Sequence, residues 1–489
     1  MNDLAEKAVH GLDVARRALV ARPMRSFAVL GFAIASAVVV AGGRVNAQQS
    51  TRPLSGWFGL QPTHGVRRDH YLPGAIMLAA VLALALLWLG VVRFVRRHEQ
   101  PESRVWLVGG AWALPFVLGP PLLGTTVQTY VAFGLLQRDG LSPYDFGPAR
   151  LGGNAIVAAI DPTVRDTPSS AGPLGTFVQH LAVSISSGSA LGGLLVLRGL
   201  AVICTIFIGR LATDLAGPSR ARALSLTVLN PLVLVYVVSA ARLDGLLLVF
   251  VLAALSAATQ RRWVAAVALA CLAGSVSGQG FLLIPVILAV HLLGRRTMPV
   301  WRLLGRDLLV AAATTIAAAL IVSDGFGWLS TVSKQFSAHP PYSLATAVAK
   351  LLTPIVRGAS YDDLAAGARI TVVTAMVCVV GYLVITARQR APERTVGYAL
   401  LAVAVLSPIT YPWYLLWGIV CLAPAATGVR RVMVLALSVA CCLINPPGFT
   451  STTSNVLSGV ALSVTLAVLV ALPSVRRVTL GQPAITGER

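Results

Sequence analysis

Acidic residues in the polar segments between long apolar runs are the clearest candidates for chemistry in this 489-residue chain. The longest polar segment, residues 124–188, contains Asp139, Asp145, Asp161 and Asp166. A positioned carboxylate can take the proton of an attacking hydroxyl group. A polar loop with embedded acids therefore suits a pocket that holds a phosphate-bearing polyprenyl headgroup beside an acceptor sugar. An ordinary extracytoplasmic loop is the alternative.

A further acid lies in a short turn between two apolar runs, at Arg242-Leu243-Asp244. An acid at the outer end of a membrane span is costly to keep there without a role. Asp244 is therefore our preferred candidate for a catalytic base. The alternative is that Asp244 caps the following helix and pairs with Arg242. For Asp145, the alternative is a turn-forming role in the sequence Ser-Pro-Tyr-Asp.

Cationic and aromatic side chains supply candidates for substrate binding. Arg198 could grip phosphate oxygens through two parallel hydrogen bonds, and structural pairing with a loop carboxylate is the alternative. Lys334 and His339, in a later polar segment, are weaker candidates for the same phosphate. Trp413 and Tyr414 could stack on a sugar ring, although the aromatic belt of a membrane interface is the slightly favoured alternative.

The composition is that of an all-α polytopic membrane protein. Hydrophobic residues make up 56% of the chain and charged residues 12%, and the mean hydropathy is +0.77; all are far from the averages of soluble domains. Runs of about 20 apolar residues, enough to cross a ~30 Å hydrocarbon core, recur along the chain. We predict about 13–14 transmembrane helices, near residues 26–44, 73–95, 105–123, 189–212, 222–239, 244–258, 263–279, 280–294, 307–323, 368–387, 395–409, 413–426, 432–446 and 456–473.

Positive charge sets the predicted topology. The net charge is +21, and most of it comes from arginines in short loops between the spans. In a soluble protein this excess would suggest nucleic acid, but the positive-inside rule explains it here, so no nucleic-acid partner is expected. Both termini should then be cytoplasmic, and the polar loops at about 124–188 and 324–367 extracytoplasmic.

Metal and redox chemistry are not indicated. The six cysteines all lie inside apolar runs, where cysteine behaves as a small apolar packing residue. No group of histidines, cysteines and acids has the spacing of metal ligands. We therefore expect neither a metal ion nor another cofactor.

Five motifs, spread over roughly 300 residues, resemble the actinobacterial α-(1→6)-mannosyltransferases of the mannopyranosyltransferase A/B family. Their order and spacing are fairly specific for the family, although not for one member of it. The motifs are PPLLGTTVQTYVAFGLLQRDGLSPYDFGP from Pro120 onward, Arg165-Asp166-Thr167-Pro168 with Gly172-Pro173-Leu174, Val196-Leu197-Arg198, Leu229-Asn230-Pro231-Leu232-Val233-Leu234, and Pro412-Trp413-Tyr414.

The resemblance implies a GT-C-like glycosyltransferase fold and a multi-pass protein of the cell membrane. It implies transfer of a hexose, in this family mannose, from a polyprenyl-phosphate sugar donor to a glycan or glycolipid acceptor. The acceptor would be a lipoglycan or cell-wall glycan on the outer face of the membrane. The matching positions add Tyr130 and Tyr144 to the substrate-binding candidates, together with Arg242.

Departures from the family pattern fall on the expected catalytic positions. Thr126 stands where the resemblance places a catalytic aspartate, and Arg242-Leu243 stand where it places His-Asn. An inverting transfer needs a base, and a threonine hydroxyl cannot act as one near neutral pH. Asp244, Asp145 and Asp166 are the carboxylates that we expect to supply it, with Asp244 preferred.

Two main hypotheses follow. The chain is either an active hexosyltransferase with a displaced catalytic acid, or a catalytically degenerate paralogue that binds lipid-linked sugar or assists another transferase. An unrelated permease is a third, less favoured alternative. We expect residues 1–104 to form a cytoplasmic N-terminus with two membrane helices, 105–475 a GT-C-like membrane domain, and 476–489 a cytoplasmic tail.

Overall fold

The computed structural model describes residues 23–46, 52–61, 71–293, 299–331, 343–356, 358, 360–407, 411–444, 457–461, 463–465 and 467. No strand occurs among these residues, so the predicted all-α class is confirmed. The main helices are α2 (Pro23–Asn46), α3 (Tyr71–Arg97), α4 (Glu102–Leu118), α5 (Thr126–Arg138), α6 (Ala155–Ala158), α7 (Pro173–Ile185), α8 (Ala190–Ala216), α9 (Arg220–Thr227), α10 (Asp244–Thr259), α11 (Trp263–Val276), α12 (Leu283–Leu293), α13 (Val300–Ala319), α15 (Leu344–Leu352), α16 (Tyr361–Ile385), α17 (Pro392–Leu406), α18 (Pro412–Leu422) and α19 (Gly428–Cys441).

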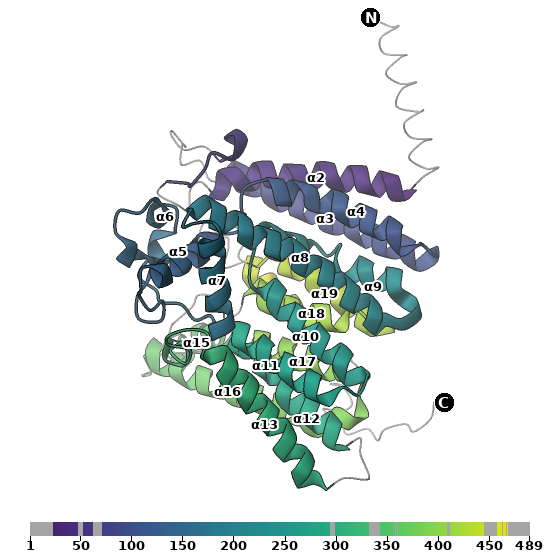
Figure 1. Cartoon of the computed structure of the whole chain (residues 1–489). Coiled ribbons are helices and arrows are strands. Elements are labelled where there is room, and N and C mark those ends of the chain that lie inside the picture. Colours follow the sequence, from purple (N-terminus) through teal and green to yellow (C-terminus); the bar gives the residue numbers. More distant parts are fainter. Residues whose placement is uncertain are drawn as a thin grey trace, which may run out of the picture.

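The long helices form one bundle (Figure 1). Helices α2, α3 and α4 pack together along one edge, and α8, α9, α10, α18 and α19 occupy the middle. Helices α11, α12, α13, α16 and α17 form the opposite side. The helices of the polar segment 124–188, which are α5, α6 and α7, gather at one end of the bundle, where α15 also lies.

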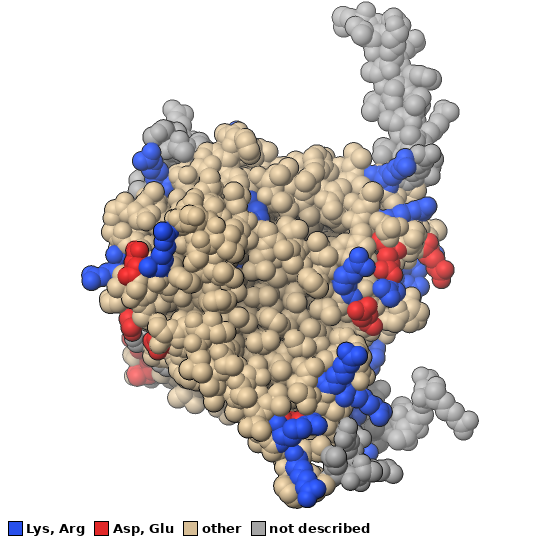
Figure 2. Space-filling model, viewed as in Figure 1, with Lys and Arg blue, Asp and Glu red and all other residues tan. Residues whose placement is uncertain are grey.

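Charged side chains lie mainly at the two ends of the helices (Figure 2). The band between these ends is largely uncharged on the face shown, as expected for helices that are surrounded by hydrocarbon. Exposed apolar residues are accordingly numerous on the long helices, for example Leu86 on α3, Phe207 on α8 and Ile370 on α16. The chain therefore has the surface of a multi-pass membrane protein.

Among the residues that the structure describes, fewer helices than the predicted 13–14 are long enough to span a membrane by themselves. The predicted runs from 26–44 to 432–446 all overlap helices, whereas 456–473 is described only in part. Within the described residues, four helices are long and apolar enough to cross a membrane by themselves, or five if one bent pair counts as a span. Several others are short: α18 has 11 residues, and at ~1.5 Å per residue such a helix covers only about half of a hydrocarbon core.

The polar segment 124–188 is a folded unit. Helices α5 and α7 pack closely, and a Cβ atom at Gly134 of α5 would lie 2.4 Å from the carbonyl oxygen of Gln179 in α7. The connecting loops are tied by backbone hydrogen bonds, including Ser169 N–H to Pro143 O (2.8 Å) and Gly172 N–H to Val276 O (3.0 Å). The last bond attaches the polar segment to the end of α11. The segment is thus fixed over one end of the bundle.

Candidate active site

A sharp break in the chain creates the site. The π-helix η5 (Val233–Ser239) and α10 meet at an angle of 113°, and Ala241 between them has φ +48°, a value that non-glycine residues rarely adopt. Non-helical backbone at membrane depth is tolerated where it lines a cavity, and π-helical turns often occur at functional sites. The break places Arg242 and Asp244 side by side.

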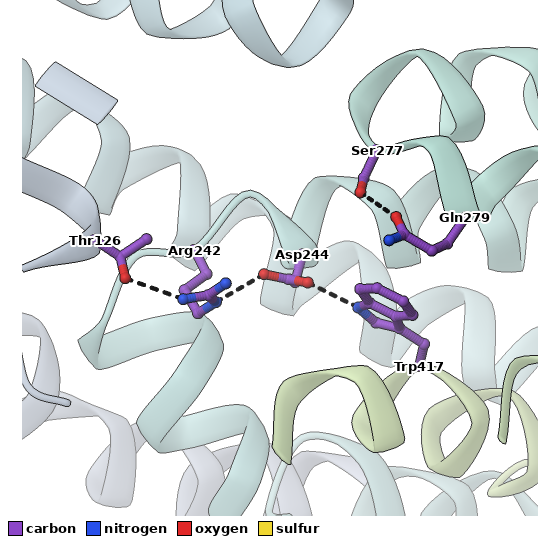
Figure 3. A network of polar contacts seen from close by, with 6 residues as sticks. All are labelled: Thr126, Arg242, Asp244, Ser277, Gln279 and Trp417. Carbon is purple, nitrogen blue, oxygen red and sulfur yellow. Dashed lines mark hydrogen bonds and ion pairs between the residues drawn. The ribbon is translucent and has the colours of Figure 1, made fainter. Parts of the chain in front are cut away.

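A row of polar contacts crosses this break (Figure 3). Arg242 donates from Nη1 to Thr126 Oγ1 (3.0 Å) and from Nε to Asp244 Oδ2 (2.8 Å). Trp417 Nε1 donates to Asp244 Oδ1 (2.8 Å). The Arg242 and Asp244 side chains are only 11% and 9% exposed. Both oxygens of Asp244 are therefore occupied by donors, and the row joins α5, α10 and α18.

Aromatic rings surround the arginine. The guanidinium carbon of Arg242 lies 3.7 Å from the ring centre of Trp413, a close cation–π contact. Tyr411 stacks on the same ring with centroids 4.3 Å apart, and Tyr414 packs against Trp417 at 4.6 Å. Because Arg242 and Tyr411 together cover the faces of Trp413, this ring is not open for stacking on a sugar in this arrangement.

Residues of this row line two adjoining cavities. The first, here called the threonine cavity, has a volume of about 470 Å³ and is lined by residues that include Thr125, Thr126, Asp161, Thr163, Tyr236 and Trp413. The second, the arginine cavity, has a volume of about 190 Å³ and is lined by residues that include Tyr130, Phe133, Arg242, Asp244, Ser277 and Trp417. Both cavities share Thr129 and Val164. Two polar molecules could therefore lie next to each other here.

A small apolar groove, with a volume of about 30 Å³, adjoins the threonine cavity. One wall is formed by Met77 and Leu78 of α3. Another is formed by Pro231, just before the π-helix, and by Val235 within it. The groove and the threonine cavity share Leu123 and Tyr236. A lipid chain in this groove would present its polar end to the threonine cavity.

Tyr130 supplies an uncharged donor to the arginine cavity. Burial raises the pKa of its phenol, while nearby Arg242 lowers it and Asp244 raises it. The net effect is a raised pKa, so the hydroxyl group stays protonated at neutral pH. Among the described residues, no group of three or more histidines, cysteines and acids could hold a metal ion.

The structure brings five of the predicted residues together. Tyr130, Arg242, Asp244 and Tyr414 line the arginine cavity, and Trp413 lies on the wall of the threonine cavity. The ion pair considered as an alternative role for Asp244 is present. The capping role is not, because the start of α10 has no side-chain cap hydrogen bond.

Arg198 and Tyr144 are not among the lining residues of either cavity. Arg198 is 2% exposed and donates to the carbonyl oxygens of Val117 (3.2 Å), Gly119 and Ser239 (3.0 Å). It thus satisfies carbonyl groups at the end of α4 and at the helix break, rather than a loop carboxylate. Tyr144 donates to or accepts from Thr176 (2.9 Å), and burial raises its pKa to about 12.

The other predicted candidates are not gathered at the cavities. Asp145 and Asp166 are exposed on the polar segment and are not among the lining residues. Asp145 does take part in the expected turn, since its N–H donates to Ser142 O at 3.3 Å. Lys334 and His339 lie outside the described residues.

The lining residues that the sequence did not assign to the site include Asp161, Tyr411 and Trp417. Asp161 was grouped with the other loop acids, and the only local signal was the following proline, which favours a helix start after a capping residue. Tyr411 and Trp417 flank the Pro-Trp-Tyr motif, and Trp417 follows Trp413 by one helical turn. This spacing places both indoles on one face of α18.

Models of one protein family match most of the chain. The family model described as α-(1→6)-mannopyranosyltransferase, N-terminal domain, matches residues 28–293, more than half of the chain. The MptB C-terminal domain model matches residues 343–475. Alpha-(1→6)-mannopyranosyltransferase A of Mycobacterium tuberculosis is 27% identical over 436 residues, which cover 85% of this chain and 83% of that protein. Alpha-(1→6)-mannopyranosyltransferase B of Corynebacterium glutamicum is 25% identical over 445 residues, which cover 83% and 73%.

Proposed function

This chain belongs to the α-(1→6)-mannopyranosyltransferase family, and from this premise we propose that it is a membrane mannosyltransferase. The donor would be a polyprenyl-phosphate mannose, and the acceptor a glycan or glycolipid on the outer face of the membrane. The observation that carries the proposal is the pair of adjoining polar cavities, one of which continues into an apolar groove. A lipid-linked sugar and a second sugar need such a site.

The apolar groove supports a donor with a hydrocarbon chain. Its chain would lie between α3 and η5, with the phosphate near Leu123 and Tyr236, where the groove joins the threonine cavity. The donor sugar would then occupy the threonine cavity. The acceptor would approach from the arginine cavity, across the shared residues Thr129 and Val164.

Arg242 is the residue that we assign to the donor phosphate. It lines the arginine cavity, and its Nη1 bonds Thr126 on the wall of the threonine cavity. A guanidinium group can bind two phosphate oxygens at once. Its Nη2 makes no hydrogen bond within the described residues, whereas Nη1 and Nε are held by Thr126 and Asp244. Asp244 would therefore act as a positioning residue that fixes the guanidinium group.

The outer-face location is supported by charge. The pair Arg96-Arg97 ends α3, and the pair Arg261-Arg262 comes shortly after the end of α10. Arginines at such helix ends are the pattern of cytoplasmic ends. The polar segment 124–188 covers the other end of the bundle (Figure 1). A multi-pass protein with this arrangement would carry out the transfer outside the cytoplasm.

The test is mannosyl transfer in membranes that express the chain. Labelled polyprenyl-phosphate mannose and a short mannoside acceptor are incubated with these membranes and with empty-vector membranes. We expect labelled product from the wild type and at least a tenfold lower rate from Arg242→Gln, because a neutral amide cannot replace the charge at the phosphate. A product level no higher than in empty-vector membranes would refute the proposed mannosyltransferase activity.

A non-catalytic role is the second candidate. The observation that favours a non-catalytic role concerns Asp244, because both oxygens of its carboxylate already accept hydrogen bonds. A chain with this role would bind polyprenyl phosphate without turning over the mannosylated donor. Saturable binding of polyprenyl phosphate to the purified chain, together with absent transfer, would favour this function.

A further inference from the structure

We propose that Asp161 is the general base of the transfer, an inference that rests on the proposed mannosyltransferase function. Asp161 precedes the short helix η3 (Pro162–Val164) and lies on the wall of the threonine cavity, which Thr126 also lines. It is half-buried. The cavity is the one we assign to the donor sugar, so a carboxylate on its wall can reach the place where the new bond forms.

The Asp161 side chain is held in one orientation. Its Oδ1 accepts from Thr163 N–H (2.9 Å) and from Thr163 Oγ1 (2.8 Å). Its backbone N–H donates to Thr125 Oγ1 (3.1 Å), which attaches the loop to the start of α5. The preceding carbonyl group, of Ile160, accepts two hydrogen bonds from Arg165, at 3.0 and 2.9 Å. A carboxylate on a fixed loop can be aimed at a substrate with little reorganisation.

One oxygen of this carboxylate remains for chemistry. Within the described residues, Asp161 Oδ2 accepts no hydrogen bond, whereas both oxygens of Asp244 are bonded. A proton added to Asp244 would also leave the buried charge of Arg242 without its partner, which is costly. Asp145 and Asp166 are exposed and line neither cavity. Of the two acids on the cavity walls, Asp161 is therefore the better proton acceptor.

The chemical step is a single displacement. The acceptor hydroxyl oxygen attacks C1 of the mannosyl group, and a new C1–O bond forms as the bond from C1 to the phosphate oxygen breaks. The hydroxyl proton moves to Oδ2 of Asp161. The bonding electron pair leaves with polyprenyl phosphate, whose developing charge faces Arg242. Water later takes the proton from Asp161 and restores the carboxylate.

Asp161→Asn tests this assignment with little change in shape. The amide keeps an oxygen for the two bonds from Thr163, but it cannot accept the proton. We expect kcat to fall by ~10²–10⁴, the usual contribution of a general base, while binding of polyprenyl phosphate and thermal stability stay close to wild type. Asp145→Asn, on the same polar segment, is the matched control and should keep the wild-type rate.

The possible results are distinguishable. A wild-type rate in Asp161→Asn would overturn the role of Asp161 and leave the proposed function intact. Loss of both polyprenyl phosphate binding and stability would show a structural role instead, and would also overturn the assignment. If the wild-type chain itself transfers no mannose, the proposed function fails, and the inference fails with it.

Discussion

Removal of the Asp244 charge probes the polar row at the helix break. In Asp244→Asn, Arg242 would keep its bond to Thr126 and its contact with Trp413, but it would lose its ion-pair partner. Breaking a buried ion pair typically costs ~3–5 kcal/mol. The Arg242 and Asp244 side chains are still 11% and 9% exposed, and the cation–π contact remains. We therefore expect the unfolding free energy to fall by about 3 kcal/mol, the lower end of this range.

The assay is equilibrium unfolding of the purified chain in lipid nanodiscs. A double-mutant cycle with Arg242→Gln separates the pair from its surroundings. The double variant Arg242→Gln/Asp244→Asn leaves no unpaired buried charge. It should therefore recover about half or more of the unfolding free energy that Asp244→Asn alone loses. The exposed pair Arg220–Glu102 (45% and 33% exposed) provides the matched control, and Glu102→Gln should cost less than about 1 kcal/mol.

A negligible coupling energy would refute this reasoning. If Asp244→Asn and Glu102→Gln cost the same, the Arg242–Asp244 pair is no more important than a surface contact. If the double variant is as unstable as the sum of the single variants, the two charges act independently. Either result would remove the physical basis for calling Asp244 the residue that positions Arg242.

Three further predictions concern the residues around the site. Trp417→Phe removes the donor to Asp244 Oδ1, so the unfolding free energy should fall by about 1.5–3 kcal/mol. Gly134→Ala places a methyl group 2.4 Å from an α7 carbonyl oxygen, and proteolysis near α5 should become faster because the packing costs ~1–3 kcal/mol. Burial raises the pKa of Tyr144 to about 12. The stabilisation of the fold by its uncharged phenol is therefore complete below the unfolded-state pKa of about 10 and is lost as the pH rises toward 12. In Tyr144→Phe, the unfolding free energy should fall less steeply with pH in this range.

The helical class could be predicted because it depends on composition. Apolar runs bounded by arginines mark helices from α2 to α19, and the structure has helices at these places. The number of full spans could not be predicted, because hydropathy does not show where a run is broken. The runs around 222–239 and 244–258 read as two ordinary spans, yet the π-helix and the 113° bend turn them into the wall of a cavity.

The site could be predicted only where residues are close in sequence. Arg242 and Asp244 are two positions apart, so their pairing was an explicit alternative. The sequence favours phosphate binding for Arg198 because a guanidinium group can grip phosphate oxygens through two hydrogen bonds. Its actual acceptors are backbone carbonyl groups released at helix ends, and no side-chain pattern marks those. To predict Asp161 as a site residue, one would have to know which part of the polar segment 124–188 folds back onto α5.

The groove between α3 and η5 has a consequence for kinetics. If the lipid tail stays in the bilayer while its phosphate reaches the threonine cavity, the protein encounters its donor by lateral diffusion in two dimensions. The rate would then follow the mole fraction of donor in the membrane and not its molar concentration in the sample. Added detergent or phospholipid would slow the reaction by surface dilution alone, with the total amounts of protein and donor unchanged.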